Sequence, residues 1–179
     1  MKMIKQEKNM NKRFVYHSSV NKSIEWYTPY YIFEKLNIEF DLDPASNDFS
    51  NSIVKAKNYF TKEDDGLSKE WNGKVWLNPP YGILTKIWIK KAIEEYEKNN
   101  IQIIVLLFAR TDTSWFHESL QYFEQICFTR GRIKFINGTT KEVAKDSPSS
   151  GSIFLSIGNE MNKAVKRADF GTCINLRGK

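Results

Sequence analysis

The stretch IQIIVLLFA, residues 101–109, is nearly uniformly apolar. An apolar run of this kind, without alternation, is typical of a central strand that is buried on both faces of a parallel sheet. It is far shorter than the roughly 20 residues that a membrane-spanning helix needs. The stretch therefore predicts the centre of an α/β sheet and no membrane span.

Shorter elements are predicted on both sides of this strand from apolar spacing and from stop signals. Before it we expect a helix from Pro29 to about Leu36, a strand over 39–43, a short irregular helix within 46–58, a strand over 74–77 and a helix from about Ile87 to Asn99. After it we expect a helix with Trp115, Phe116 and Leu120, a strand over 125–129 and 133–136 interrupted by Arg130-Gly131, and a strand over 152–157.

Strands that alternate with helices predict an α/β fold, here with a mostly parallel sheet flanked by helices. In such sheets ligands bind just outside the carboxyl ends of the strands. The residues that carry chemistry are therefore expected directly after predicted strands.

Charge is distributed unevenly along the chain of 179 residues, whose formal net charge is +6. Residues 1–22 hold six Lys or Arg against the single acidic residue Glu7. We predict a basic N-terminal arm over 1–22, which either contacts phosphates or is simply solvated, and one domain over 23–179. A monomer is compatible with this length.

The two cysteines, Cys127 and Cys173, have no CxxC or Cys/His spacing. They are expected to be buried reduced thiols, with no disulfide framework and no metal site. The basic N-terminus is followed by no apolar segment, so it does not resemble a secretory signal, and a cytoplasmic location is expected.

The tetrapeptide Asn78-Pro79-Pro80-Tyr81 follows the predicted strand over 74–77. Two prolines fix the backbone and remove two donors, so that Pro79 can present an unpaired carbonyl. The Asn78 side chain adds a second acceptor and Tyr81 adds a flat ring. Such a set can hold a planar group with an exocyclic amine, with Tyr81 stacked on its ring. The alternative is a strand end followed by an ordinary surface turn.

These residues resemble the motif of S-adenosylmethionine-dependent amino-methyltransferases that act on adenine N6. Further segments occur in an order similar to that of the small phage-type DNA N-6-adenine-methyltransferases, over roughly residues 25–158. They are Trp26-Tyr27-Thr28-Pro29, Asp43-Pro44-Ala45-Ser46, Tyr59-Phe60-Thr61, Asp65-Gly66-Leu67, Trp88, Trp115-Phe116 and the stretch Gly131 to Phe135.

The resemblance implies a minimal class I methyltransferase-like (Rossmann-like) domain with S-adenosylmethionine as cofactor and double-stranded DNA as partner. It implies a catalytic role for Asn78 to Tyr81. It implies cofactor binding by Tyr27, Thr28 and Pro29, by Asp43, Pro44, Ala45 and Ser46, and by Asp65. A carboxylate at Asp43 suits the ammonium of the cofactor, although Asp43 could instead cap a turn and Asp65 could lie in a solvated loop.

One feature differs from most methyltransferases of this fold, because residues 41–58 contain no glycine-rich turn. The small phage-type enzymes share this difference. Contacts to nucleic acid are expected from Arg110, which could instead pair with Asp112, and from Arg130, Arg132 and Lys134, which could instead be ordinary surface charges. The loop over 137–150 is expected to reach a DNA groove.

The activity that follows is methyl transfer from S-adenosylmethionine to N6 of a flipped adenine by direct in-line displacement. A glutamine side chain and an RNA base also present a planar amine, so a methyltransferase acting on RNA or protein remains an alternative. A second alternative is a nucleic-acid-binding module with a degenerate methyltransferase fold.

Overall fold

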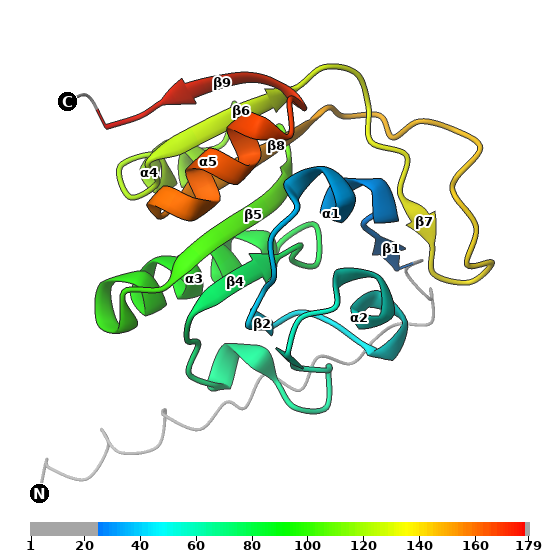
Figure 1. Ribbon diagram of the computed structural model, residues 1–179, viewed down its shortest axis with the longest axis horizontal. Coiled ribbons are helices and arrows are strands. Elements are labelled where there is room, and N and C mark those ends of the chain that lie inside the picture. The colour runs from blue at the N-terminus through cyan, green and yellow to red at the C-terminus, as the bar shows by residue number, and fades with distance from the viewer. Residues whose placement is uncertain (1–24, 178–179) are drawn as a thin grey trace, which may run out of the picture.

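The structure, a computed structural model, describes residues 25–177, and the basic arm over 1–22 lies outside the described residues. Figure 1 shows a central sheet with helices on both faces. The helices are α1 (Tyr30–Leu36), α2 (Asp48–Val54), the short 3-10 helix η1 (Gly66–Ser68), α3 (Thr85–Asn99), α4 (Ser114–Ser119) and α5 (Asn159–Arg167).

Seven strands form the main sheet in the order β3-β2-β4-β5-β8-β6-β9. Their bounds are β2 (Leu42–Asp43), β3 (Asn58–Tyr59), β4 (Lys74–Leu77), β5 (Gln102–Phe108), β6 (Gln125–Thr129), β8 (Ser152–Ile157) and β9 (Gly171–Asn175). A separate antiparallel pair is made by β1 (Trp26–Tyr27) and β7 (Ile136–Asn137).

The prediction of a mostly parallel sheet is wrong. The strands β3, β2, β4 and β5 are parallel neighbours, whereas β8 is antiparallel to both β5 and β6, and β6 is antiparallel to β9. The antiparallel pairings also contain more paired residues. The reason lies in the connection from β6 to β8, which contains no helix and so does not provide the crossover that parallel neighbours need.

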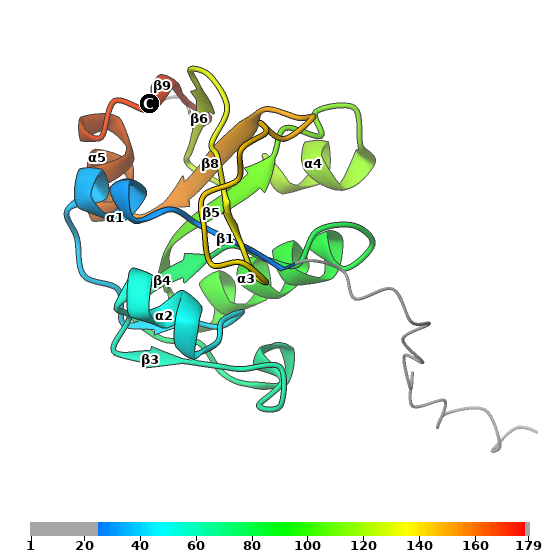
Figure 2. The same cartoon turned by 90° about the vertical axis from the view of Figure 1, so that its right-hand side faces the viewer.

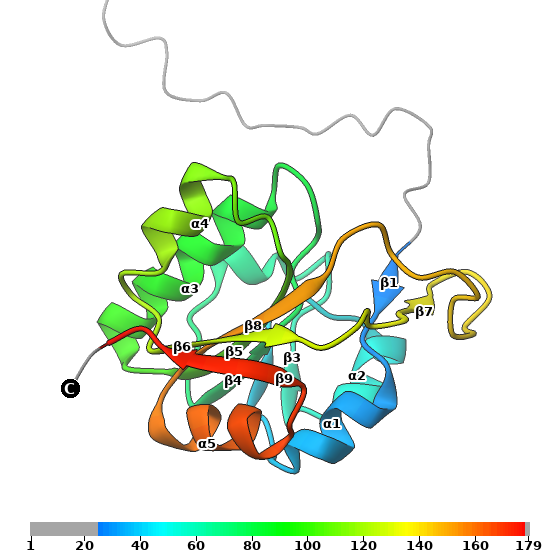
Figure 3. The same ribbon diagram turned by 90° about the horizontal axis from the view of Figure 1, so that it is seen from above.

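Side chains that alternate along the central strands build a core on each face of the sheet. Along β5, Ile104 and Leu106 point into the core that includes α1, α2 and α5, while Val105 and Leu107 point into the core that includes α3 and α4. Figure 3 shows these two sets of helices on opposite sides of the strands. The apolar run thus lies at the centre of the sheet, buried on both faces as predicted.

Most of the predicted elements are present. The helix at 30–36 and the strands at 74–77 and 152–157 have the expected bounds. The strand expected over 39–43 is regular only at Leu42–Asp43, because the Asp41 carboxylate turns to accept hydrogen bonds from the Lys74 N–H and the Lys57 ammonium. The helix α5 and the strand β9 were not predicted.

The strand expected over 133–136 is also wrong. After β6 the chain turns at Gly131, which has a φ of 82°. Arg132 then donates to the Pro148 carbonyl and Lys134 to the Lys145 carbonyl, at 2.5 and 3.1 Å. These contacts draw the segment away from the main sheet, and only Ile136–Asn137 forms a strand, which pairs with β1.

Cys127 and Cys173 are free thiols that lie opposite one another across β6 and β9. Cys127 is buried as predicted, and burial raises its pKa to about 12. Cys173 is only half-buried, contrary to the prediction, because β9 is the edge strand of the sheet within residues 25–177.

Within residues 25–177, each helix is too short or too polar to cross a bilayer.

Candidate active site

The Asn78 side chain lies directly after β4 and has its amide group fixed by three contacts. Its Nδ2 donates to the Thr28 Oγ1 at 3.3 Å and lies 3.5 Å from the Trp26 carbonyl oxygen. Its Oδ1 accepts the Tyr81 hydroxyl hydrogen at 2.9 Å. An amide oxygen has two lone pairs, so Oδ1 keeps one free for a further donor.

The two prolines leave a second acceptor beside this amide. Among the described residues, no donor reaches the Pro79 carbonyl, while the Pro80 carbonyl accepts the Thr85 hydroxyl hydrogen at 3.1 Å. Pro79 is itself buried. The Asn78 oxygen and the Pro79 carbonyl therefore both keep acceptor capacity, on a backbone that the prolines hold rigid.

The Tyr81 ring belongs to a cluster of three aromatic side chains. It stacks on Phe108 with centroids 4.0 Å apart and an interplanar angle of 18°, and it meets Phe135 edge to face at 6.2 Å. Burial raises the pKa of Tyr81 well above its usual value, so its hydroxyl stays protonated and remains a donor. Phe108 supports one face of Tyr81 from behind, which holds the ring in place.

Sequence reasoning assigned no site role to Phe108, and it quoted Phe135 only as part of a similar segment. Phe108 could have been recognised as the one aromatic residue of β5, placed at its carboxyl end after a run of aliphatic residues. Phe135 reaches the site only because the segment after β6 leaves the main sheet, which the sequence did not predict.

Asp43 ends β2, the strand next to β4, and its side chain is only 2% exposed. Burial raises the pKa of its carboxyl group to about 7, although a hydrogen bond from the Ala45 N–H, at 3.2 Å, favours the charged form. A buried carboxylate without a basic neighbour is costly. Among the described residues no ion pair involves Asp43, so the side chain is suited to receive a cationic group.

The loop Pro44 to Ser46 is held by a close contact with η1. A Cβ atom at Gly66 would lie 2.0 Å from the Pro44 carbonyl oxygen, so only glycine fits there. The buried Trp71 indole donates to the Gly66 carbonyl at 2.9 Å, and the Ser46 N–H donates to the Phe60 carbonyl at the same distance. These contacts bring residues 65–66 against the predicted cofactor loop.

The short acidic run at 63–65 contains two aspartates, Asp64 and Asp65, whose contacts differ. Asp64 accepts hydrogen bonds from both the N–H and the hydroxyl of Thr61, which closes a turn and lowers the pKa of Asp64. Asp65 is exposed and its side chain makes no cap for η1. Of the two, Asp65 is therefore the one whose carboxylate is available to a ligand beside the Pro44 loop.

The segment Tyr27-Thr28-Pro29 covers the same edge of the sheet. In Figure 2, β1 and the segment that carries β7 cross in front of the ends of β4 and β5. Tyr27 and Thr28 are buried, and the Lys141 ammonium lies over the rings of Tyr27 and Phe49 at 4.8 and 4.3 Å. The loop over 137–150 thus packs, at Lys141, on the predicted cofactor segment.

The four residues predicted to contact nucleic acid are all exposed but differ in their contacts. Arg132 and Lys134 bind backbone carbonyls of the 145–148 segment, so their charges hold this loop. Arg110 follows β5 and makes no ion pair with Asp112 or with any other acidic group that the structure describes. Arg130 follows β6.

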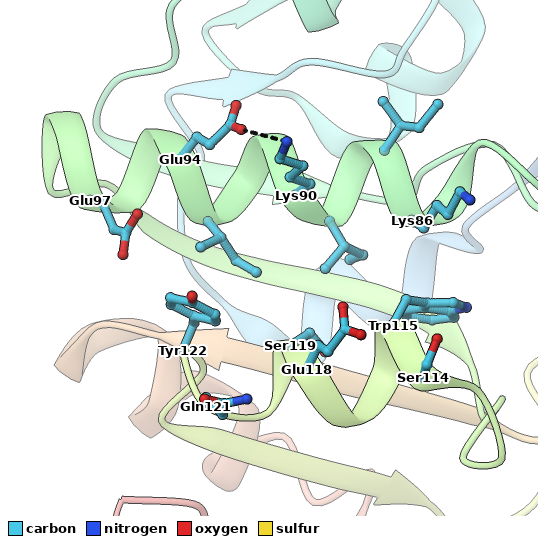
Figure 4. Close-up of a pocket in the computed structure, with 13 residues that line it drawn as sticks. Lys86, Lys90, Glu94, Glu97, Ser114, Trp115, Glu118, Ser119, Gln121 and Tyr122 are labelled. Atoms are coloured by element: carbon cyan, nitrogen blue, oxygen red, sulfur yellow. Dashed lines mark ion pairs between the residues drawn. The ribbon is translucent and has the colours of Figure 1, made fainter.

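A groove of about 840 Å³ lies between α3 and α4. Its lining does not include the site residues described above. Figure 4 shows its walls, with Lys86, Ser114 and Trp115 together at one end. These three residues are at the N-terminal ends of the two helices, which begin near the carboxyl ends of β4 and β5. The groove lining includes neither Asn78 nor Asp43.

Two adjacent strand ends therefore present a buried carboxylate and a rigid pair of acceptors beside an aromatic cluster. This is the arrangement expected of an amino-methyltransferase. The sequence model of the family described as DNA N-6-adenine-methyltransferase (Dam) matches residues 16–173. The chain belongs to this family.

Two phage proteins are similar to this chain. The DNA N-6-adenine-methyltransferase of Haemophilus phage HP1 (strain HP1c1) is 32% identical over 123 residues, which cover 65% of this chain and 69% of the phage protein. The DNA N-6-adenine-methyltransferase of Escherichia phage T1 is 34% identical over 134 residues, which cover 65% of this chain and 54% of the phage protein.

Proposed function

We propose that this protein transfers a methyl group from S-adenosylmethionine to N6 of an adenine that has been flipped out of double-stranded DNA. The observation that carries the proposal is the pair of acceptors at Asn78 and Pro79, presented beside the Tyr81 ring. Family membership supports adenine in DNA as the substrate. We further infer a class I methyltransferase-like fold, in which β2 and β4 place the cofactor and the base side by side.

The residues of the β2 end fit the proposed cofactor. When bound, S-adenosylmethionine supplies an activated methyl group on a sulfonium. Its amino-acid part carries an ammonium, and the buried Asp43 carboxylate would hold this group and so gain the charged partner that it otherwise lacks. The exposed Asp65 would bind a polar group of the cofactor, and Tyr27, Thr28 and Pro29 would close over it.

Asn78 and Pro79 would activate the amine of the substrate. The lone pair of adenine N6 is delocalised into the ring, so the amine is a poor nucleophile until its geometry becomes tetrahedral. The Asn78 Oδ1 and the Pro79 carbonyl each accept one N–H, and these bonds strengthen as positive charge develops on the nitrogen. The hydrogen bond that Asn78 donates to Thr28 and the one that it accepts from Tyr81 fix the amide in advance.

Tyr81 would carry out two separable tasks. Its ring, supported by Phe108, would stack on the base, and its hydroxyl, which donates to the Asn78 Oδ1, would orient the amide. We expect Tyr81→Ala to weaken binding of the flipped base by about 1–3 kcal/mol, the range for bases stacked on aromatic side chains. Tyr81→Phe keeps the ring and should leave base binding unchanged, while the rate of the chemical step falls. Single-turnover rates at increasing DNA concentration separate the effect on base binding from the effect on the chemical step. If Tyr81→Ala and Tyr81→Phe change both quantities to the same extent, the ring and the hydroxyl do not have separate tasks.

The proposed activity is tested by supplying labelled S-adenosylmethionine with duplex DNA, RNA or protein in parallel reactions. We expect label in DNA alone, recovered as N6-methyladenine after digestion to nucleosides. Label in RNA or protein without label in DNA would support methyl transfer from the cofactor but contradict DNA as the substrate. Calorimetry that detects no binding of S-adenosylmethionine would identify a degenerate binding module instead. The basic arm over 1–22 and Arg110 remain proposed phosphate contacts.

A further inference from the structure

The turn that joins Tyr81 to α3 exposes apolar side chains beside the proposed base site. Ile83 is 73% exposed, the largest fraction for any large apolar residue in the described part of the chain, and Leu84 and Ile87 are 36% and 43% exposed. Single exposed apolar residues are common on proteins. Three of them within five residues of one another, directly after the motif that would hold the base, call for a specific partner.

This turn is fixed at both ends. Gly82 has a φ of 97°, a backbone conformation that favours glycine, and its carbonyl accepts the Thr85 N–H at 3.2 Å. The buried Thr85 hydroxyl holds the Pro80 carbonyl, and the Trp88 N–H bonds to the Leu84 carbonyl at 3.1 Å. Ile83 therefore projects from a turn that is anchored to the site on one side and to α3 on the other.

We propose that Ile83 enters the DNA duplex and fills the space that the target adenine leaves when it moves into the site. This inference rests on the proposed function, because it requires a flipped base. Apolar side chains such as Ile, Leu and Phe insert between base steps in other DNA-binding proteins, where they compensate for lost stacking. Filling the gap with an apolar side chain stabilises the complex with the extruded base, because the side chain is removed from water.

The position of Ile83 in the chain suits this role. It lies two residues after Tyr81, a separation of at most about 7 Å, which is about two base-pair steps along the duplex. A side chain so close to the stacking ring can occupy the duplex while Tyr81 contacts the extruded base. Lys86, three residues further on, and Arg110 at the end of β5 are exposed cations that can contact the flanking phosphates.

The proposal is tested with duplexes that contain the sequence this protein methylates, read first from DNA modified in cells. In one duplex the target adenine is paired with thymine, and in a second it lies opposite an abasic site, where extrusion needs much less energy. In a third, 2-aminopurine replaces the target adenine and reports extrusion by its fluorescence. The variants are Ile83→Ala and Ile83→Phe, with Ile87→Ala as a matched control on the same exposed surface.

We expect Ile83→Ala to lose most of the 2-aminopurine fluorescence increase and to methylate the paired duplex at least tenfold more slowly than the wild-type protein. On the unpaired target its rate should return to within about threefold of wild type. Ile83→Phe restores an apolar side chain and should retain extrusion, and Ile87→Ala should resemble wild type throughout.

Any of the following results would overturn the proposal. If Ile83→Ala extrudes the base and methylates the paired duplex as the wild-type protein does, the side chain does not enter DNA. If its methylation rate falls by the same factor on the paired and the unpaired target, the side chain acts after extrusion. Equal losses of methylation rate in Ile83→Ala and Ile87→Ala would show that the exposed apolar turn acts as a whole and not through insertion of Ile83. If the wild-type protein methylates adenine without any fluorescence change, base flipping fails and Ile83 has no gap to fill. If it methylates no DNA, the proposed function itself fails.

Discussion

Asn78→Ala is expected to slow methyl transfer by about 100-fold to 1,000-fold, equivalent to about 2.7–4 kcal/mol, the loss seen when one preorganised hydrogen-bonding group is removed from an active site. The substitution removes one of two acceptors for the amine and leaves the prolines, β4 and Tyr81 in place. The effect should appear in the single-turnover rate with DNA and cofactor both saturating, because the acceptor acts mainly on the developing charge.

Asn78→Asp is the matched control for this variant. A carboxylate keeps an acceptor at the same position but cannot donate to the Thr28 hydroxyl oxygen as the amide does. We therefore expect it to retain more activity than Asn78→Ala. Cofactor affinity and thermal unfolding of both variants should stay close to wild type. A folded Asn78→Ala protein that methylates adenine at the wild-type rate would disprove the role of this acceptor.

Asp43→Ala is expected to weaken binding of S-adenosylmethionine by about 10-fold to 150-fold, since a charge-assisted hydrogen bond contributes about 1.5–3 kcal/mol. Isothermal titration calorimetry measures this directly. DNA binding without cofactor should be nearly unchanged, because Asp43 is buried. A folded Asp43→Ala protein that binds the cofactor with wild-type affinity would place the ammonium elsewhere.

The pKa of Asp43 adds a dependence on pH that distinguishes this residue from a simple turn cap. Because the carboxyl group has a pKa of about 7 in the folded protein and about 3.9 when unfolded, the folded state holds an extra proton between these values. The ligand-free protein should therefore lose stability as the pH rises from about 4 to 7. Cofactor affinity should rise over the upper part of this range, because the ammonium requires the ionised carboxylate.

Asp43→Asn separates these effects from changes in packing, because the amide has the same shape and never ionises. In this variant both the stability trend and the affinity trend should be flatter than in the wild-type protein. Thermal unfolding and calorimetry between pH 5 and 8 provide the two measurements. A wild-type stability that is unchanged over this range would show that Asp43 ionises with an ordinary pKa.

Residues 25–130 were more predictable from sequence than the later described residues, for a physical reason. The apolar run at 101–109 and the proline-terminated strand at 74–77 carry strong local signals, so β4, β5 and the position of Asn78 follow directly from the chain. Strand direction beyond β5 depends on which distant segments meet. The placement of Phe135 depends likewise on hydrogen bonds from Arg132 and Lys134 to a loop, which no local pattern indicates.

The family resemblance pointed to two strand ends as the candidate site, and the structure adds how the residues there contact one another. The bonds from Asn78 to Thr28 and Tyr81 join residues that are fifty and three positions apart in the chain. The resemblance implied only a cofactor role for Thr28, whereas in the structure its hydroxyl oxygen accepts a hydrogen bond from the Asn78 amide. Gly66 is a comparable case, because its need for close approach to Pro44 is visible only in three dimensions.

The placement of β8 between β5 and β6 governs how the chain can fold as it is synthesised. β5 precedes β8 by more than forty residues, and β6 has no partner in the sheet until β8 or β9 arrives. A nascent chain that has not yet been synthesised as far as residue 157 therefore keeps one edge of its most apolar strand, β5, unpaired. Exposed strand edges of this kind favour aggregation. Completion of the sheet, and with it support for Phe108 beneath Tyr81, becomes possible only after β8 has been synthesised.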